Sequence, residues 1–177
     1  SKDIIVFDDV IYISLDDLGA LFNKTIEVDS ANNSLFIGDK PGEAYYLGEQ
    51  IKAYSTGYAY NEYPDSGSFD MAGITYYSGV TSTVGGTGYD SSGYYNLDKK
   101  FTNIKGFYGP NDDTQKGSST TILFYCDDKL TLTLETAQGD MPKEFSLDIT
   151  NVSQLKIEFV TSSHSAPSFA LADVVIY

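Results

Sequence analysis

Residues 143–160 read KEFSLDITNVSQLKIEFV, and apolar side chains recur in this stretch at every second position on either side of the turn TNVSQ. The recurring residues are Phe145, Leu147, Ile149, Leu155, Ile157 and Phe159. Because successive side chains of a β-strand point to opposite faces, a period of two places these residues on one face of each strand. The stretch therefore predicts two β-strands, each with one buried face and one solvent-facing side.

The same alternation continues through most of the chain. Leu130, Leu132 and Leu134 alternate with threonines, and the turn sequences CDDK, QGDMPK and SSHSAPS bound the apolar runs. No helical pattern of useful length appears between about residue 45 and residue 177. Short strands of this kind, separated by turns, are typical of two stacked antiparallel sheets. We therefore predict an all-β fold, an antiparallel β-sandwich, for residues 45–177.

A break between two units is expected near Gly38–Ala44, where Gly, Pro and charged residues cluster. Residues 1–40 before it predict a small ββαββ unit, with Ser14 and Asp17 capping its helix. The expected strands are residues 4–7, 10–14, 25–29 and 34–38, and the expected helix is residues 15–22. So short a unit buries little apolar surface, and we expect it to pack on something else.

This first unit, residues 1–38, resembles part of the N-terminal domain of copper amine oxidases, a stalk-like module. The residues that fit the pattern of that domain are Tyr12, Leu15, Leu18, Ile26, Val28, Asp29, Leu35 and Ile37. The resemblance implies a spacer and no copper chemistry. The segment also has neither His nor Cys with which to hold copper.

The charge of the chain excludes several kinds of partner. The sequence has 11 basic and 25 acidic residues, a net charge of −14, and no basic patch that could contact phosphates. No apolar stretch approaches the length of a bilayer-spanning helix, and no signal peptide is visible at SKDIIVF. We expect no nucleic-acid partner and no membrane insertion. The 15 Tyr and 16 Gly residues, with no Trp, suit an extracellular protein.

The second unit also resembles a known family. The segments that carry the resemblance are residues 46–49 (YLGE), 71–80 (MAGITYYSGV), 95–101 (YNLDKKF), 123–130 (LFYCDDKL) and 172–177 (ADVVIY). In this order they are similar to the NPCBM family of carbohydrate-binding modules, which have a galactose-binding-like jelly-roll sandwich. The resemblance implies a non-catalytic glycan-binding module in a larger secreted or cell-surface bacterial protein, beside other modules.

The sequence departs from that family at polar and aromatic positions. The Gly-Trp step of the family is Gly57-Tyr58 here, and a His common in the family falls near Thr83. The acidic, His and Trp residues before the last strand fall in residues 168–171, which read SFAL. We retain Thr83 as a candidate ligand residue on this resemblance. The departures leave open a second function, a structural or protein-interaction sandwich that has lost sugar binding.

Tyrosines give the strongest binding signal among the residues themselves. The sequence TGYAYNEYPDSG contains Tyr58, Tyr60 and Tyr63 in an expected loop, followed by Asp65. An exposed aromatic ring beside carboxylates suits the apolar face and the hydroxyl groups of a sugar. Tyr89 and Asp90, in GTGYDSSGYY, form a second candidate pair by the same reasoning. Tyrosines at alternating positions also build sandwich rims that bind nothing.

Metal binding and catalysis have weaker signals. Asp112 and Asp113 lie in an oxygen-rich loop that suits a structural calcium ion, although Asp is also an ordinary turn former. His164 is the only histidine, and no glycines characteristic of a nucleophile turn surround any serine. We therefore expect no enzyme activity and no certain cofactor.

Overall fold

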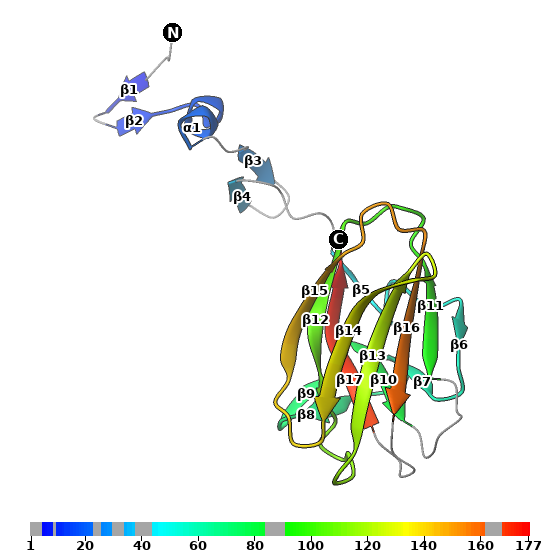
Figure 1. Ribbon diagram of the computed structural model, residues 1–177. Coiled ribbons are helices and arrows are strands. Elements are labelled where there is room, and N and C mark those ends of the chain that lie inside the picture. Colours follow the sequence, from blue (N-terminus) through cyan, green and yellow to red (C-terminus); the bar gives the residue numbers. More distant parts are fainter. Residues whose placement is uncertain are drawn as a thin grey trace. The chain divides into compact units, whose positions relative to one another are not determined.

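In the computed structural model the chain forms two units, Ser1–Gly42 and Glu43–Tyr177 (Figure 1). The structure describes residues 5–8, 10–22, 26–29, 34–37, 44–83, 91–161 and 168–177. In the first unit, β1 (Ile5–Phe7) pairs with β2 (Val10–Tyr12), and β3 (Ile26–Asp29) pairs with β4 (Ser34–Ile37). The helix α1 (Leu15–Phe22) lies between these hairpins in sequence.

The helix begins as its sequence predicts. The backbone N–H of Asp17 donates to Ser14 Oγ at 3.1 Å, and the Ser14 hydroxyl donates to the Asp17 carboxylate at 2.8 Å. This reciprocal pair satisfies a backbone N–H that has no partner within the helix. The ββαββ order expected of the first unit is therefore present.

The second unit is a sandwich of two antiparallel sheets (Figure 1). The six-stranded sheet has the order β15-β12-β17-β10-β7, with β5 added to β17. Its strands are β5 (Tyr45–Tyr46), β7 (Tyr60–Tyr63), β10 (Gly79–Thr83), β12 (Asn103–Pro110), β15 (Lys143–Asp148) and β17 (Ser168–Ile176). The predicted all-β antiparallel sandwich is confirmed.

The five-stranded sheet has the order β14-β13-β16-β11-β6. Its strands are β6 (Ser55–Thr56), β11 (Ser92–Asn96), β13 (Ser119–Cys126), β14 (Lys129–Ala137) and β16 (Gln154–Thr161). The hydrophobic core between the two sheets contains the alternating residues of 143–160, all of which are buried. The period of two therefore identified the buried faces of β15 and β16.

Leu130 is a correction to that pattern, because its side chain is 47% exposed. The pairing of β13 with β14 shifts register between Phe124 and Tyr125, so Leu130 lies opposite Tyr125 and Leu132 lies opposite Phe124. Residues directly opposite on neighbouring strands share a face of the sheet. Phe124 points into the core, whereas the bulge places Leu130 with Tyr125 on the outer face.

A short hairpin, β8 (Phe69–Met71) and β9 (Ile74–Tyr76), contributes to a second apolar cluster outside the main core. The buried members of this cluster are Tyr63, Phe69, Met71, Ala170 and Ala172, with Tyr76 and Phe107 packed against them. Ala170 and Ala172 alternate along β17 with Phe169 and Leu171, which belong to the main core. The cluster therefore lies on the outer face of the six-stranded sheet.

Candidate functional site

A hollow of about 290 Å³ lies at the end of the six-stranded sheet where β10 ends and β17 begins. Thr83 and Ser168, the terminal residues of these two strands, are paired across the sheet. The other walls are Tyr63, residues 68–70 and residues 111–113. We call this cavity the loop-end hollow. It brings together residues from five separate parts of the sequence.

Asn111 lines the loop-end hollow and carries a buried side-chain oxygen. Its side-chain amide donates to Ser168 Oγ, and its backbone N–H donates to the Ser168 carbonyl oxygen at 2.9 Å. The side-chain oxygen Oδ1 is buried and has no hydrogen-bond partner among the described residues. Buried polar atoms in folded proteins are nearly always paired, so this oxygen retains an unused capacity to accept a hydrogen bond.

Thr83 is an exposed residue at the same hollow. Its hydroxyl oxygen accepts a hydrogen bond from the side-chain amide of Asn61 at 2.7 Å. A threonine hydroxyl carries one hydrogen and two lone pairs, so it can still donate to a ligand oxygen. Thr83 therefore offers a hydroxyl donor at the hollow, and its role as a ligand residue stays a prediction.

Both carboxylate oxygens of Asp112 support a turn. One carboxylate oxygen accepts the backbone N–H of Ala72 at 2.7 Å, and the other accepts that of Gly73 at 2.8 Å. These two residues form the turn of the β8–β9 hairpin, and both have positive φ angles, 52° and 76°. The turn-forming alternative therefore accounts for Asp112. In the described parts of the chain, no group of three or more His, Cys, Asp or Glu side chains could hold a metal ion.

The tyrosines of the expected loop occupy two different environments. Tyr58 is 89% exposed, whereas Tyr60 and Tyr63 are only 5% and 7% exposed. The expected exposure of Tyr60 and Tyr63 is therefore wrong. Both belong to β7, which pairs with β10. Their side chains lie on opposite faces of this strand: Tyr60 points into the main core, and Tyr63 points into the cluster under the hairpin. Tyr63 still contributes to the wall of the loop-end hollow.

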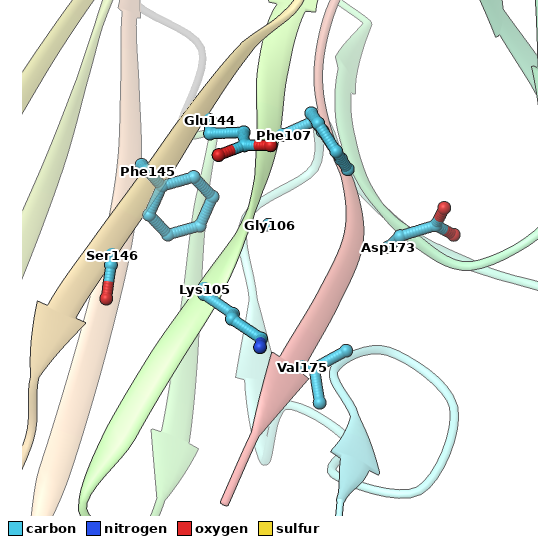
Figure 2. Close-up of a pocket in the computed structure, with 8 residues that line it drawn as sticks. All are labelled: Lys105, Gly106, Phe107, Glu144, Phe145, Ser146, Asp173 and Val175. Atoms are coloured by element: carbon cyan, nitrogen blue, oxygen red, sulfur yellow. The ribbon is translucent and has the colours of Figure 1, made fainter.

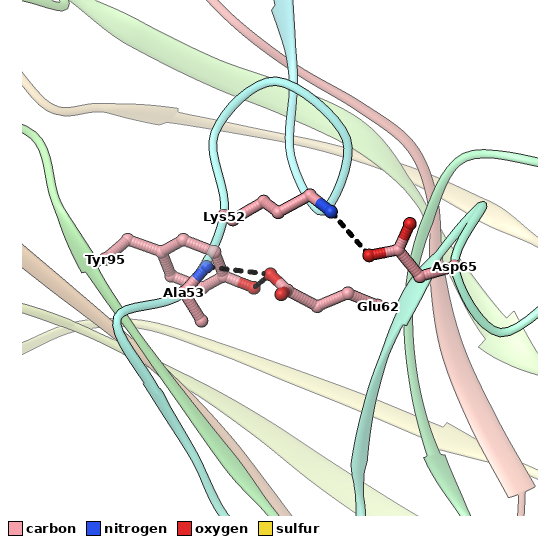
Figure 3. Close-up of polar contacts among 5 residues, drawn as sticks. All are labelled: Lys52, Ala53, Glu62, Asp65 and Tyr95. Atoms are coloured by element: carbon pink, nitrogen blue, oxygen red, sulfur yellow. Dashed lines mark hydrogen bonds and ion pairs between the residues drawn. The ribbon is translucent and has the colours of Figure 1, made fainter.

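The Tyr60 ring is held by a buried polar chain. Its hydroxyl lies 2.9 Å from the hydroxyl of Tyr95, which in turn donates to Glu62 at 3.0 Å. Glu62 also accepts the backbone N–H of Ala53, as Figure 3 shows. Burial raises the pKa of both phenols well above the ordinary value, so they stay protonated and act as fixed structural donors.

Of the other candidates that the structure describes, Asp65 and Tyr58 are not among the residues that line the loop-end hollow. Asp65 forms an exposed ion pair with Lys52 (Figure 3), and this partner raises the pKa of the lysine. Tyr58 lies beside Ala59, whose carbonyl oxygen accepts the backbone N–H of Thr83 at 3.1 Å. It therefore belongs to the same end of the sandwich. Tyr89, Asp90 and His164 lie outside the described residues.

Sequence reasoning did not select Asn111 or Ser168 as site residues. The family resemblance already placed lost polar positions in residues 168–171, which was a signal for Ser168. Asn111 adjoins the pair Asp112–Asp113, but nothing local distinguishes it from an ordinary turn residue. Its role depends on pairing with a strand that begins 57 residues later.

The second unit is thus a two-sheet antiparallel sandwich with the loop-end hollow at one end of its six-stranded sheet. Residues 44–172 match the NPCBM/NEW2 domain family, and the chain belongs to that family. No match was found among proteins of curated function. Among the described residues, no helix is both long and apolar enough to cross a bilayer.

Solved structures share this fold at low sequence identity. A CBM51 module from Clostridium perfringens GH95, in complex with methyl-galactose, is 17% identical with a TM-score of 0.59; the match covers 76% of this chain and 99% of that one. The tandem CBM51 modules of the family 98 glycoside hydrolase of Streptococcus pneumoniae are 9% identical, with a TM-score of 0.62 and coverage of 77% and 47%. At these identities the likeness concerns the fold alone.

A third similar structure contains further domains. It holds CBM51-2, in complex with GlcNAc, and the INT domains of Clostridium perfringens ZmpB. The identity is 13% and the TM-score 0.58, over 85% of this chain and 35% of that one. The chain thus spans about a third of that structure.

Proposed function

We propose that the second unit binds glycan in the loop-end hollow. The observation that carries the proposal is the buried, unpaired Oδ1 of Asn111 beside the hydroxyls of Thr83 and Ser168. Hydroxyl groups of a sugar both donate and accept hydrogen bonds, so they match an amide oxygen next to two hydroxyls. The rings of Tyr63 and Phe69 supply the apolar wall against which the C–H face of a sugar would pack.

Two further features of this end support a sugar ligand. Asp113 is exposed at the hollow and offers a carboxylate, a strong acceptor for sugar hydroxyls. Tyr58 presents an almost fully exposed ring at the same end. Similar CBM51 modules have been solved with methyl-galactose and with GlcNAc, which makes these two sugars the natural probes.

We also propose that the module acts without catalysis, outside the bacterial cell, as one part of a larger protein. CBM51 domains of Clostridium perfringens ZmpB have been solved together with an M60 catalytic domain, which supports this arrangement. Weak individual sites of this kind become useful through multivalency. The family match begins at residue 44, so the copper amine oxidase-like resemblance of the first unit, and its role as a spacer, stay predictions.

The test is a calorimetric titration of the whole chain with methyl-galactose and with N-acetylglucosamine. Thr83→Ala removes one hydroxyl at the hollow and should weaken binding about fivefold to tenfold, the value of one hydrogen bond. The matched control is Thr133→Ala, the same change at an exposed position of β14, which should bind as the unmodified chain does.

Asn111→Ala gives the second readout. We expect it to abolish measurable binding, since it removes the unpaired Oδ1 itself, and its melting temperature is measured in parallel. If neither these two sugars nor their β-linked oligomers release heat with the unmodified chain, the glycan proposal is wrong. The structural or protein-interaction alternative then becomes the better reading.

A further inference from the structure

A second and larger cavity crosses the outer face of the six-stranded sheet. Its volume is about 630 Å³, more than twice that of the loop-end hollow and within the range typical of ligand pockets. Its lining comes from three neighbouring strands: Lys105–Phe107 of β12, Glu144–Ser146 of β15, and Asp173 and Val175 of β17 (Figure 2). We call it the sheet trough. None of its residues lines the loop-end hollow.

The sheet trough is shaped by a β-bulge in β17. Phe107 lies opposite Ala172 and Lys105 lies opposite Val175, so β17 uses one more residue than β12 over this interval. Asp173 lies in the bulge, with a φ of 47°, and its backbone N–H donates to the carbonyl oxygen of Ser78 at 3.0 Å. A bulge of this kind re-aims a side chain. Here it adds a carboxylate at the rim of the trough.

The two carboxylates of the trough have no hydrogen-bond or ion-pair partner in the described part of the chain. No described residue forms a hydrogen bond or an ion pair with the side chains of Asp173 or Glu144. Partial burial, uncompensated by any donor, raises the pKa of Asp173 above its ordinary value. The ammonium of Lys105 lies 5.2 Å from the centre of the Tyr177 ring and is paired with neither carboxylate.

The mixture of groups selects the chemical class of the ligand. An anion would be repelled by Asp173 and Glu144, whereas a cation would be attracted by these two carboxylates and repelled by Lys105. A wholly apolar ligand would cover three charges without pairing them, at a large cost. A neutral ring with hydroxyl groups avoids all three penalties, since it donates to the carboxylates and accepts from the ammonium. Its apolar face would pack on Phe107, which Figure 2 shows beside Glu144.

We propose that the sheet trough is a second saccharide site, binding a neutral pyranose between Glu144, Lys105 and Asp173. The ligand class rests on the proposed function, because the trough would bind the same class of ligand as the loop-end hollow, but through none of the same residues. Along β17 the loop-end hollow begins at Ser168, the apolar cluster follows at Ala170 and Ala172, and the trough follows at Asp173. At about 3.3 Å per residue the two sites are roughly 17 Å apart.

The experiment is an NMR titration of the whole ¹⁵N-labelled chain with methyl-galactose, N-acetylglucosamine and their β-linked oligomers. We expect saturable shifts at Lys105, Phe107 and Glu144, with an affinity distinct from that of the shifts at Thr83 and Asn111. Shifts at the loop end alone overturn the trough proposal and leave the proposed function intact. Shifts at the trough alone do the reverse, and an absence of shifts at both overturns both.

A double variant, Glu144→Gln with Asp173→Asn, removes both charges without changing shape. Asn tolerates the left-handed backbone of residue 173, so the fold should be retained. We expect trough binding to weaken at least about fivefold, since two charge-assisted hydrogen bonds become neutral ones, while loop-end binding is unchanged. The matched control is Glu135→Gln, on β14 outside the trough, which should leave both affinities unchanged. Unaltered trough affinity in the double variant would count against the site.

Discussion

Tyr58 and Tyr60 are two positions apart in the sequence, and their contributions to stability should differ strongly. Tyr60 is buried against Tyr95 and Phe159, and Gly93 leaves space for its ring, since a Cβ there would lie 2.4 Å from the Tyr60 side chain. Tyr60→Ala should lower the free energy of unfolding by about 3–5 kcal/mol, the usual cost of truncating a core aromatic. Tyr58→Ala should change it by no more than about 0.5 kcal/mol.

Urea denaturation of the two variants checks this pair. The sugar affinity of Tyr58→Ala should be measured as well. A loss of affinity without a loss of stability would indicate that the Tyr58 ring contacts the ligand. Equal losses of stability in both variants would show that the environments assigned to the two rings are wrong.

The burial of single tyrosines was the least predictable feature of the chain. Tyr has an apolar ring and a polar hydroxyl, so a Tyr pattern does not reveal which face is buried. The stretch TGYAYNEYPDSG also carries Gly, Pro and Asp, which favoured a loop. What buries Tyr60 and Tyr63 is pairing with β10, a contact about 20 residues away that no local pattern encodes.

At the scale of an element, the β8–β9 hairpin depends on one carboxylate from another segment. Asp112→Ala removes the acceptors of two backbone N–H groups at its turn, at roughly 0.5–1.5 kcal/mol for each hydrogen bond. We expect faster amide hydrogen exchange at Ala72 and Gly73, with a smaller effect in Asp112→Asn, which keeps one acceptor oxygen. Exchange measured by NMR distinguishes the two variants.

Calcium provides the contrasting test of the same loop. Because both oxygens of Asp112 already accept backbone N–H groups, added Ca²⁺ should leave the melting temperature of the unmodified chain unchanged. A rise in melting temperature with Ca²⁺ that disappears in Asp113→Ala would instead support the calcium prediction.

Elements with a strict period of two were predictable, because burial of one face selects the alternation. This holds for β15 and β16, whose apolar residues all reach the core. It fails at Leu130, where a bulge moves one end of β14 to the outer face. The bulge at Asp173 was equally invisible, since both depend on how neighbouring strands align and not on the composition of one strand.

For the whole molecule, acid should reduce stability through two aspartates, the half-buried Asp140 and the exposed Asp148. The Lys143 ammonium and the Ala137 N–H lower the pKa of Asp140, and hydrogen bonds from Thr150 lower the pKa of Asp148. A pKa that is lower in the folded state than in the unfolded state gives stability that is present above the unfolded value and is lost as the pH falls. The midpoint of urea unfolding should therefore decrease below about pH 4.

Asp173 acts in the opposite direction, because its pKa is raised in the folded state. Its ionisation costs stability as the pH rises, so Asp173→Asn should be slightly more stable than the unmodified chain at pH 7 and should lose this advantage in acid.

The contribution of Asp140 and Asp148 is checked with the double variant Asp140→Asn, Asp148→Asn. Its free energy of unfolding should fall less steeply below about pH 4 than that of the unmodified chain. Measurements at high salt limit the contribution of the −14 net charge. If the double variant and the unmodified chain lose stability equally as the pH falls, Asp140 and Asp148 are not the source of the acid sensitivity.

The two-sheet architecture could be predicted for the whole second unit, but its candidate sites could not. Period and turns determine that sheets form and which faces are buried. The loop-end hollow and the sheet trough each need three or more distant segments to meet, and only the strand order brings these together. The family resemblance pointed to Thr83 and to residues 168–171, and of these Thr83 and Ser168 line the loop-end hollow.

The strand order also bears on how this domain is made. β17 lies between β12 and β10, in the middle of the six-stranded sheet, although it comes after all the other strands of that sheet in sequence. A ribosome therefore delivers the flanking strands of that sheet before the strand that joins them. Until residues 168–176 have left the exit tunnel, β10 and β12 have no partner between them, so completion of this domain must follow the synthesis of its final segment.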